Sequence, residues 1–208
     1  MPLDLWLAFV AASSALLLIP GPTVLLVLSY ALTKGRSVAV ASAAGVALGD
    51  LIAMSASLAV LGALVLASAT LFTFLKWVGA AYLVYLGIRL WRSAPEAALG
   101  ELAEISAMRA GGVFGHAAAV TALNPKSIAF FIAFVPQFLR PEAPLIPQFV
   151  ILIATFVSLA ALNALAYALL ADQLRHWIAR PKIIAGLTRI GGVALVAMGI
   201  ATATLRRA

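Results

Sequence analysis

The stretch VAVASAAGVALGDLIAMSASLAVLGALVL, residues 38–66, decides the fold class of this chain. Its 29 residues hold a single charged side chain, Asp50. About 20 apolar residues in an α-helix are enough to cross the ~30 Å hydrocarbon core of a bilayer. Because apolar residues cover the whole circumference of this helix rather than one stripe, the stretch predicts a membrane-spanning helix.

The same pattern recurs on both sides of this stretch. Continuous runs of Leu, Ala and Val argue against a β-barrel, whose strands alternate apolar and polar residues. The sequence therefore predicts an all-α membrane protein, with residues 1–208 as a single transmembrane domain of six helices. The other five apolar segments are expected at residues 5–32, 71–88, 113–134, 149–170 and 183–205.

The composition agrees with a membrane protein and excludes several classes of site. Hydrophobic residues make up 64% of the chain and charged residues only 10%, whereas a soluble domain has roughly 25% charged residues. The absence of cysteine excludes disulfides, thiolate metal sites, iron–sulfur clusters and a thiol-based redox conduit. The sequence contains no nucleotide-binding or hydrolase motif. We therefore expect no metal, no cofactor and no enzymatic activity.

The basic residues predict the orientation. If the helices alternate, eight basic residues fall on one side of the membrane and three on the other. The positive-inside rule places the first side in the cytoplasm and both termini in the periplasm of a bacterial inner membrane. This explains the net charge of +7 without nucleic-acid binding. The eight are Lys34, Arg36, Arg89, Arg92, Arg109, Arg175, Arg180 and Lys182, and the three are Arg140, Arg206 and Arg207.

Two segments of the chain resemble each other. The stretch GAAYLVYLGI, residues 79–88, aligns with GGVALVAMGI, residues 191–200, and five positions are identical. The first and fourth apolar segments are also interrupted at matching places, at residues 20–22 and 124–126. Chance similarity between low-complexity apolar helices is the alternative explanation. The matching breaks favour a true internal repeat.

A repeat of this kind predicts the domain organisation. With three spans in each half, the second half enters the membrane from the opposite side, which gives the 3+3 inverted-topology repeat of many secondary transporters. Residues 1–92 and 113–208 are the expected halves, and residues 93–112 are the expected cytoplasmic loop between them.

The two breaks are candidate binding elements. Pro20, Gly21 and Pro22 lie within an apolar run, where proline removes helical hydrogen bonds. Freed peptide groups at membrane depth are tolerated only inside protein or around a water-filled cavity. This turn is therefore expected to bind a zwitterion through its amides and carbonyls, and a kink that only serves packing is the alternative. The second break repeats this arrangement in Asn124, Pro125 and Lys126.

Three polar residues at membrane depth are candidates for binding or coupling. Asp50 costs about 2.5–3.5 kcal/mol at the centre of a span, so we expect it to hold a substrate ammonium or to couple proton movement. The alternative is a buried carboxylate that Lys126, or the exposed amides near Pro22, neutralise structurally. Lys126 either attracts a substrate carboxylate or snorkels to the interface. Asn163 lies at the corresponding depth of the fifth segment, where it is a symmetry mate of Asp50 or simply an interhelical hydrogen-bonding residue.

Several glycines predict close helix packing, with hinge motion as a second role. Small residues four or eight positions apart share one helical face and allow two backbones to approach closely. The glycines with this spacing are Gly45 and Gly49, Gly79 and Gly87, and Gly191 and Gly199.

Taken in order, these motifs resemble the LysE/RhtB-type family of amino-acid exporters over essentially the whole chain. The features that carry the resemblance are Pro20-Gly21-Pro22, GVALGD at 45–50, KWVGAAYL at 76–83 with Gly87, Asn124-Pro125-Lys126, Phe130-Phe131 and Pro136-Gln137-Phe138.

The resemblance implies export of amino acids or close derivatives from the bacterial cytoplasm, driven by a proton or ion gradient. It implies functional roles for the two proline breaks and Asp50, an amino-acid-like substrate as partner, and self-association as a homodimer. A non-transporting membrane subunit, or an exporter of another small solute, is the alternative reading of the same sequence.

Overall fold

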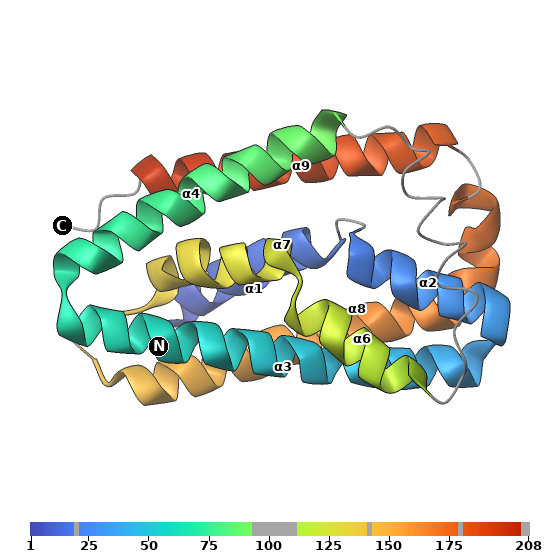
Figure 1. The fold of residues 1–208 in the computed structure, drawn as a ribbon, viewed down its shortest axis with the longest axis horizontal. Coiled ribbons are helices and arrows are strands. Elements are labelled where there is room, and N and C mark those ends of the chain that lie inside the picture. Colours follow the sequence, from blue (N-terminus) through green and yellow to red (C-terminus); the bar gives the residue numbers. More distant parts are fainter. Residues whose placement is uncertain (19–20, 93–111, 141–142, 179–180, 205–208) are drawn as a thin grey trace.

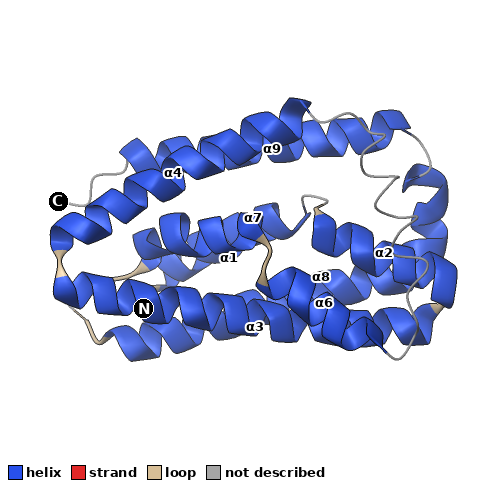
Figure 2. Ribbon diagram, viewed as in Figure 1, coloured by secondary structure: helices blue, strands red, loops and turns tan. Residues whose placement is uncertain are grey.

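The structure is a computed structural model that describes residues 1–18, 21–92, 112–140, 143–178 and 181–204. All regular elements in these residues are helices (Figure 2), so the all-α prediction is confirmed. The elements are α1 (Leu3–Leu18), α2 (Pro22–Lys34), α3 (Arg36–Ala67), α4 (Ala69–Arg92), α6 (Val113–Ala122), α7 (Pro125–Ala129), the π-helix η2 (Phe130–Phe134), the 3-10 helix η3 (Val135–Phe138), α8 (Leu145–Ile178) and α9 (Pro181–Thr204).

The helices coincide with the predicted apolar segments, and both predicted breaks are present. α1 and α2 are bent by 53° relative to each other, and α6 ends before α7 begins at Pro125. The largest boundary difference is in α8, which extends beyond the predicted residues 149–170 at both ends. Residues 93–111, which hold most of the predicted cytoplasmic loop and Arg109, lie outside the described residues, as do Pro20, Arg180, Arg206 and Arg207.

The prediction of six membrane-spanning helices is confirmed only in part. Within the described residues, four elements are long and apolar enough to cross a membrane, and the bent pair of α1 and α2 brings the number to five. The four lie in α3, in α6 to η3, in α8 and in α9. α4 is not in this set, although its 24 residues give it a length of about 36 Å. A membrane protein with several apolar helices is therefore established, and the sixth span stays a prediction.

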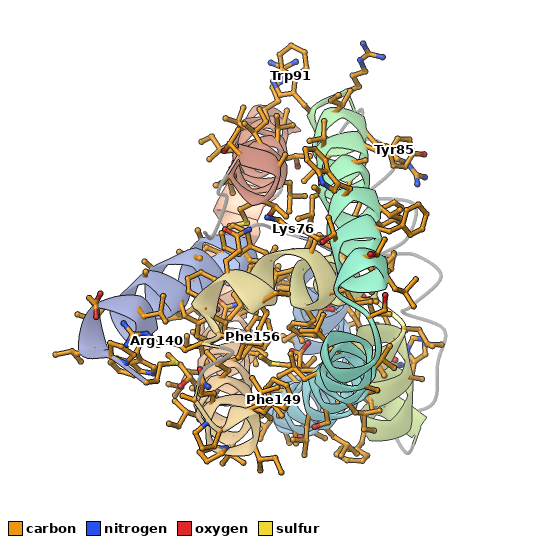
Figure 3. All side chains as sticks on the ribbon, turned by 90° about the vertical axis from the view of Figure 1, so that its left-hand side faces the viewer. Lys76, Tyr85, Trp91, Arg140, Phe149 and Phe156 are labelled. Carbon is orange, nitrogen blue, oxygen red and sulfur yellow. The ribbon has the colours of Figure 1, made fainter. Side chains whose placement is uncertain are left out.

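Large apolar side chains cover the outside of the helices. Phe74, Trp77, Leu162 and Val193 are each more than half exposed. Seen end-on, Tyr85 and Trp91 point away from the bundle, whereas Phe156 lies inside it (Figure 3). A soluble monomer rarely exposes so much contiguous apolar surface. This surface suits lipid, in agreement with the sequence.

The helices lie roughly parallel in one bundle (Figure 1). α4 and α9 run side by side along one edge, α3, α6 and α8 lie at the opposite edge, and α1 and α7 lie between them. The start of α1, the connection from α3 to α4, the end of η3 and the start of α8 lie at one end of the bundle. The turn from α2 to α3, the end of α8 and the start of α9 lie at the other end.

Glycines determine where the helices approach most closely. A Cβ atom on Gly49 of α3 would lie 2.6 Å from the carbonyl oxygen of Ala118 on α6, and one on Gly45 would overlap the backbone of Phe114. These two glycines therefore form a seam between α3 and α6 that no larger residue fits.

A second glycine seam joins α4 to α9. A Cβ atom on Gly87 would lie 2.7 Å from Cγ2 of Val196, and one on Gly199 would lie 2.7 Å from Cγ2 of Val84. The other two predicted glycines are also buried: Gly79 faces Ala133 of η2, and Gly191 lies on α9.

Candidate functional site

The first break leaves backbone carbonyls without helical partners. In an α-helix the carbonyl of residue i accepts from the N–H of residue i+4. Pro20 and Pro22 have no N–H, so the carbonyls of Leu16 and Leu18 lose their donors. Gly21 has an extended backbone (φ −132°, ψ −174°). Its N–H therefore does not continue the helix, and the carbonyl of Leu17 loses its helical donor as well. Three carbonyl oxygens at the end of α1 therefore need other donors.

Side chains from α7 and α8 supply those donors. One amine, one amide and one hydroxyl each donate to a successive carbonyl of α1, so side-chain hydrogen bonds from distant elements hold the broken end of this helix. The pairs are Lys126 Nζ to Leu16 at 3.2 Å, Asn163 Nδ2 to Leu17 at 3.1 Å, and Tyr167 Oη to Leu18 at 3.5 Å.

Tyr167 was not predicted from the sequence. It lies four residues after Asn163 on α8, and residues with this spacing share one helical face. This spacing of two polar residues is the sequence signal that could have identified Tyr167. Nothing in the sequence, however, indicated that the end of α1 faces this side of α8.

The second break is organised by Asn124. Its side-chain oxygen accepts from the backbone N–H of Lys126 at 3.0 Å, and Pro125 occupies the first turn of α7. This is an N-cap, which begins a helix by satisfying an otherwise unpaired N–H. The Asn124 amide donates to Oγ1 of Thr23 at 3.2 Å. Because Thr23 follows the first break, this hydrogen bond joins the two interruptions directly.

Asp50 lies beside these breaks on α3. Its side chain is only 3% exposed and lines the same cavity as Lys126. The opposite charges of Asp50 and Lys126 attract each other. Among the described residues, no hydrogen-bond donor to the Asp50 carboxylate is found. A buried carboxylate with spare acceptor capacity is suited to binding an ammonium group or a proton.

One cavity of about 30 Å³ connects these groups. On this measure one water needs roughly 10–15 Å³, so the space holds about two waters and is smaller than an amino acid. In this arrangement the cavity is therefore too small to hold a whole amino acid. The polar residues that line the cavity are Thr23, Asp50, Asn124, Lys126, Ser127 and Asn163, and Gly21 contributes backbone.

A buried aromatic cluster lies beyond the cavity, toward the start of α1. α1 runs from Phe9 to the cavity at Leu16, and η2 and η3 run from the cavity back to Phe138. Neighbouring rings in the cluster lie between 4.8 and 6.0 Å apart. The cluster consists of Phe9, Phe130, Phe131, Phe134, Phe138 and Phe156.

Small aliphatic residues line the opposite side of the cavity. There α2 runs away from the cavity toward Tyr30, and α6 runs toward the cavity from His116. The Tyr30 hydroxyl and Nδ1 of His116 are 3.0 Å apart, and their rings meet edge to face. The buried cluster that contains Tyr30 also holds Leu26 and Leu28, and its small members are referred to as the small-residue cluster: they include Val24, Val27, Ala31, Val46, Ala117, Ala164 and Ala168.

The structure thus brings most of the predicted site residues together. Gly21, Asp50, Asn124, Lys126 and Asn163 all line the cavity, whereas Pro125 is not among the lining residues. Pro20 and the Pro22 side chain lie outside the described part of the chain. No group of three or more His, Asp or Glu side chains suited to a metal occurs in the described part of the chain.

The comparison with known proteins agrees with this arrangement. Residues 14–205 match the family described as LysE type translocator. The chain belongs to the LysE family. Family membership identifies it as a membrane transport protein and accounts for the apolar helices around a polar, buried centre.

Several relatives of this LysE family member have names that describe efflux. A homoserine/homoserine lactone efflux protein of Salmonella typhimurium is 35% identical, with both chains covered completely. A leucine efflux protein of Salmonella choleraesuis is 29% identical over 98% of this chain and 96% of its own. An uncharacterized membrane protein of Vibrio cholerae is 33% identical over 99% of this chain and 100% of its own. No solved structure matches this chain.

Proposed function

We propose that this protein exports amino acids or close derivatives across the bacterial inner membrane as a secondary-active transporter. The family and the names of its relatives support efflux of such solutes. The observation that carries the proposal is the pairing of Asp50 and Lys126 in one buried cavity beside two broken helices. An α-amino acid carries one ammonium and one carboxylate on the same carbon, so this site offers one partner for each charge.

The broken helices add backbone partners to this site. Lys126 and the amino end of α2 favour a carboxylate, since the amino end of a helix carries partial positive charge. Asp50 and the carbonyls at the end of α1 favour an ammonium group. An arriving ammonium can replace the Lys126 amine at the carbonyl of Leu16, which releases Lys126 toward the carboxylate.

The helix contacts support two inverted halves, residues 1–92 and 113–208. A shift of 112 residues relates the two similar stretches of α4 and α9. Gly87 contacts Val196, and the residues that correspond to these two under the shift, Gly199 and Val84, also contact each other. A pair of related helices that exchange contacts in this way is expected around a pseudo-two-fold axis.

The two clusters are suited to alternating access. In this scheme, the aromatic cluster separates the cavity from one face of the membrane and the small-residue cluster separates it from the other. The positive-inside rule assigns the end with Lys34 and Arg92 to the cytoplasm and both termini to the periplasm. In the export cycle the small-residue cluster opens first, toward the cytoplasm, and the aromatic cluster opens second, toward the periplasm. Antiport of a proton or another ion couples this cycle to the ion gradient that drives it. A homodimer stays a prediction from the family resemblance.

The Tyr30–His116 contact offers a direct test of the first opening. Because α2 and α6 belong to different halves, this contact has to separate when the cavity opens toward the cytoplasm. The variant Tyr30→His places two imidazoles at the closed contact, and imidazole nitrogens bind Zn²⁺ well. Zn²⁺ at about ten times its Kd for the closed state stabilises that state roughly tenfold.

Transport by the Tyr30→His variant is therefore expected to fall about tenfold with Zn²⁺ and to recover with EDTA. Wild type and Tyr30→Phe are the controls, and both are expected to be insensitive. Equal zinc sensitivity in Tyr30→Phe, or full transport by Tyr30→His at saturating Zn²⁺, would contradict the assignment of this contact to a gate.

Uptake into inverted membrane vesicles tests the proposed function itself. Vesicles that contain the protein are expected to accumulate labelled amino acids, and an imposed proton or ion gradient is expected to increase accumulation. Vesicles without the protein are the control. If no amino acid or derivative accumulates above this control, the chain exports another solute or serves as a non-transporting subunit.

A further inference from the structure

The exposed aromatic side chains of this protein are concentrated on one helix. Of the six large aromatic side chains that are exposed in the described part of the chain, five lie on α4, and the sixth is Phe114 on α6. The large exposed side chains on α3, α8 and α9 are instead valine, leucine and isoleucine. Contacts between proteins are enriched in aromatic residues relative to the rest of the surface. The five on α4 are Phe74, Trp77, Tyr82, Tyr85 and Trp91.

Three of these side chains lie too deep for the aromatic belt of a membrane protein. Tryptophan and tyrosine are common at the lipid headgroups, about 15 Å from the bilayer centre. At a rise of 1.5 Å per residue, Trp77, Tyr82 and Tyr85 lie within about 7 Å of the midpoint of α4 along its axis. An aromatic belt therefore accounts for Trp91 near the end of α4, but not for these three residues.

The two tyrosines place unpaired hydroxyl groups on this surface. Tyr82 and Tyr85 are 37% and 55% exposed, and their ring centroids lie 6.0 Å apart. Tyr85 points away from the bundle (Figure 3). Within the described residues, neither hydroxyl forms a hydrogen bond. Lipid tails offer no donor or acceptor, so this surface is better suited to a protein partner than to lipid.

The spacing of the exposed residues on α4 suits a seam between two parallel helices. Residues that lie alternately three and four positions apart form the contact of a left-handed helix pair, which is the commonest packing in membrane bundles. All six residues in this register between 71 and 88 are exposed. The small Ala81 at the centre allows two backbones to approach closely. The six are Leu71, Phe74, Val78, Ala81, Tyr85 and Ile88.

This surface is complementary to a second copy of itself. All copies insert into the membrane in the same orientation, so a two-fold axis along the membrane normal brings two α4 helices together in parallel. A tyrosine hydroxyl both donates and accepts hydrogen bonds, so the hydroxyls of two copies can pair with each other. Arg89 and Arg92 carry like charges, but they lie at the end of α4, where water and salt screen their repulsion.

The exposed face of α4 is also large enough for a stable contact. An aromatic side chain buries about 150–250 Å² when it is fully covered. With the exposed fractions of the residues on this face, one copy supplies roughly 600 Å² and two copies supply about 1,200 Å². A specific protein–protein interface needs about 1,000 Å² in total.

We propose that two copies of this chain associate through the exposed face of α4, with Ala81 at the centre of a parallel, two-fold contact. The opposite face of α4 is buried against its own chain at Gly79 and Leu83. The contact therefore lies on the outside of the bundle, and each copy keeps its own cavity. This inference does not depend on which solute the protein moves.

Disulfide cross-linking in membranes tests this contact directly, because the chain has no cysteine. Ala81→Cys is expected to convert most of the protein into a covalent dimer on oxidation with copper phenanthroline, and dithiothreitol is expected to restore the monomer. Val78→Cys and Tyr85→Cys lie in the same register and serve as further variants in case Ala81→Cys does not reach the membrane. Val193→Cys on α9 and Leu162→Cys on α8, at positions 61% and 63% exposed, are the matched controls and are expected to stay monomeric.

Dilution with lipid separates a specific contact from chance collisions. Cross-linking of Ala81→Cys is expected to persist after reconstitution at a high ratio of lipid to protein. Combining Tyr82→Phe with Tyr85→Phe is expected to weaken dimerisation about threefold or more, which is the effect of one average hydrogen bond between membrane helices. The measurement is the dimer fraction at increasing lipid dilution.

Two outcomes would overturn the proposed contact. If the α4 and control positions cross-link equally, or if no α4 position cross-links in well-expressed protein, this face binds lipid or a different protein. Cross-linking does not require transport, so either result leaves the proposed function standing. Protein that cross-links at Ala81→Cys but moves no amino acid would overturn the proposed function and leave the contact standing.

Discussion

Asp50→Asn is expected to reduce gradient-driven accumulation of amino acids by roughly thirtyfold or more. The substitution keeps the size of the side chain but removes the negative charge that faces Lys126 in the cavity. Losing one member of a buried charge pair costs about 2–5 kcal/mol, and each 1.4 kcal/mol is a factor of ten. The measurement is the initial rate in inverted vesicles with and without an imposed proton gradient. Asp4→Asn, at an exposed position of α1, is the matched control and is expected to transport normally.

A double variant separates a transport role of Asp50 from a purely structural one. Asp50→Asn alone leaves the Lys126 charge without its acidic neighbour in the bilayer, so the thermal stability of the single variant is expected to fall as well. Asp50→Asn combined with Lys126→Met removes both charges and is expected to recover much of this stability without recovering transport. If the double variant transports like the wild type, the two charges only neutralise each other and the proposed site is wrong.

Gly49→Leu is expected to prevent the protein from folding. Even a single Cβ atom at this position would lie 2.6 Å from the carbonyl oxygen of Ala118 and 2.7 Å from Cβ of Thr121. These atoms belong to α6, and its backbone cannot withdraw without separating the α3–α6 seam. Overpacking by one methyl group already costs about 1–3 kcal/mol, and leucine adds three further carbons. The expected result is little or no monodisperse protein after detergent extraction and size-exclusion chromatography.

Gly115→Leu is the matched control for this effect. Gly115 lies on α6 itself, is exposed, and has no atom within 4 Å of an added Cβ. The same substitution there is expected to give folded protein with unchanged or slightly higher thermal stability, because leucine favours the helix more than glycine does. Normal yield and stability of Gly49→Leu would show that the α3–α6 seam can separate without loss of the fold.

Local chemistry determined much of this protein from its sequence. Long apolar runs predict helices because spanning backbone in lipid has to satisfy its hydrogen bonds within the segment. Proline at positions 20, 22 and 125 predicts both interruptions because this residue lacks an N–H. The cost of a carboxylate in a membrane identified Asp50 as a candidate. Each of these inferences depends on a residue and its immediate neighbours along the chain.

The tertiary structure decided which distant groups meet. No local rule assigns the Leu16, Leu17 and Leu18 carbonyls to donors on α7 and α8, because the partners of Leu17 and Leu18 are 146 and 149 residues away. The Tyr30–His116 contact spans 86 residues. Such pairings depend on how helices that are apolar on every face rotate and approach one another. Where hydropathy is uniform around a helix, the glycines and the few polar side chains determine which face of the helix packs against its neighbours. Only the packed bundle shows which face that is.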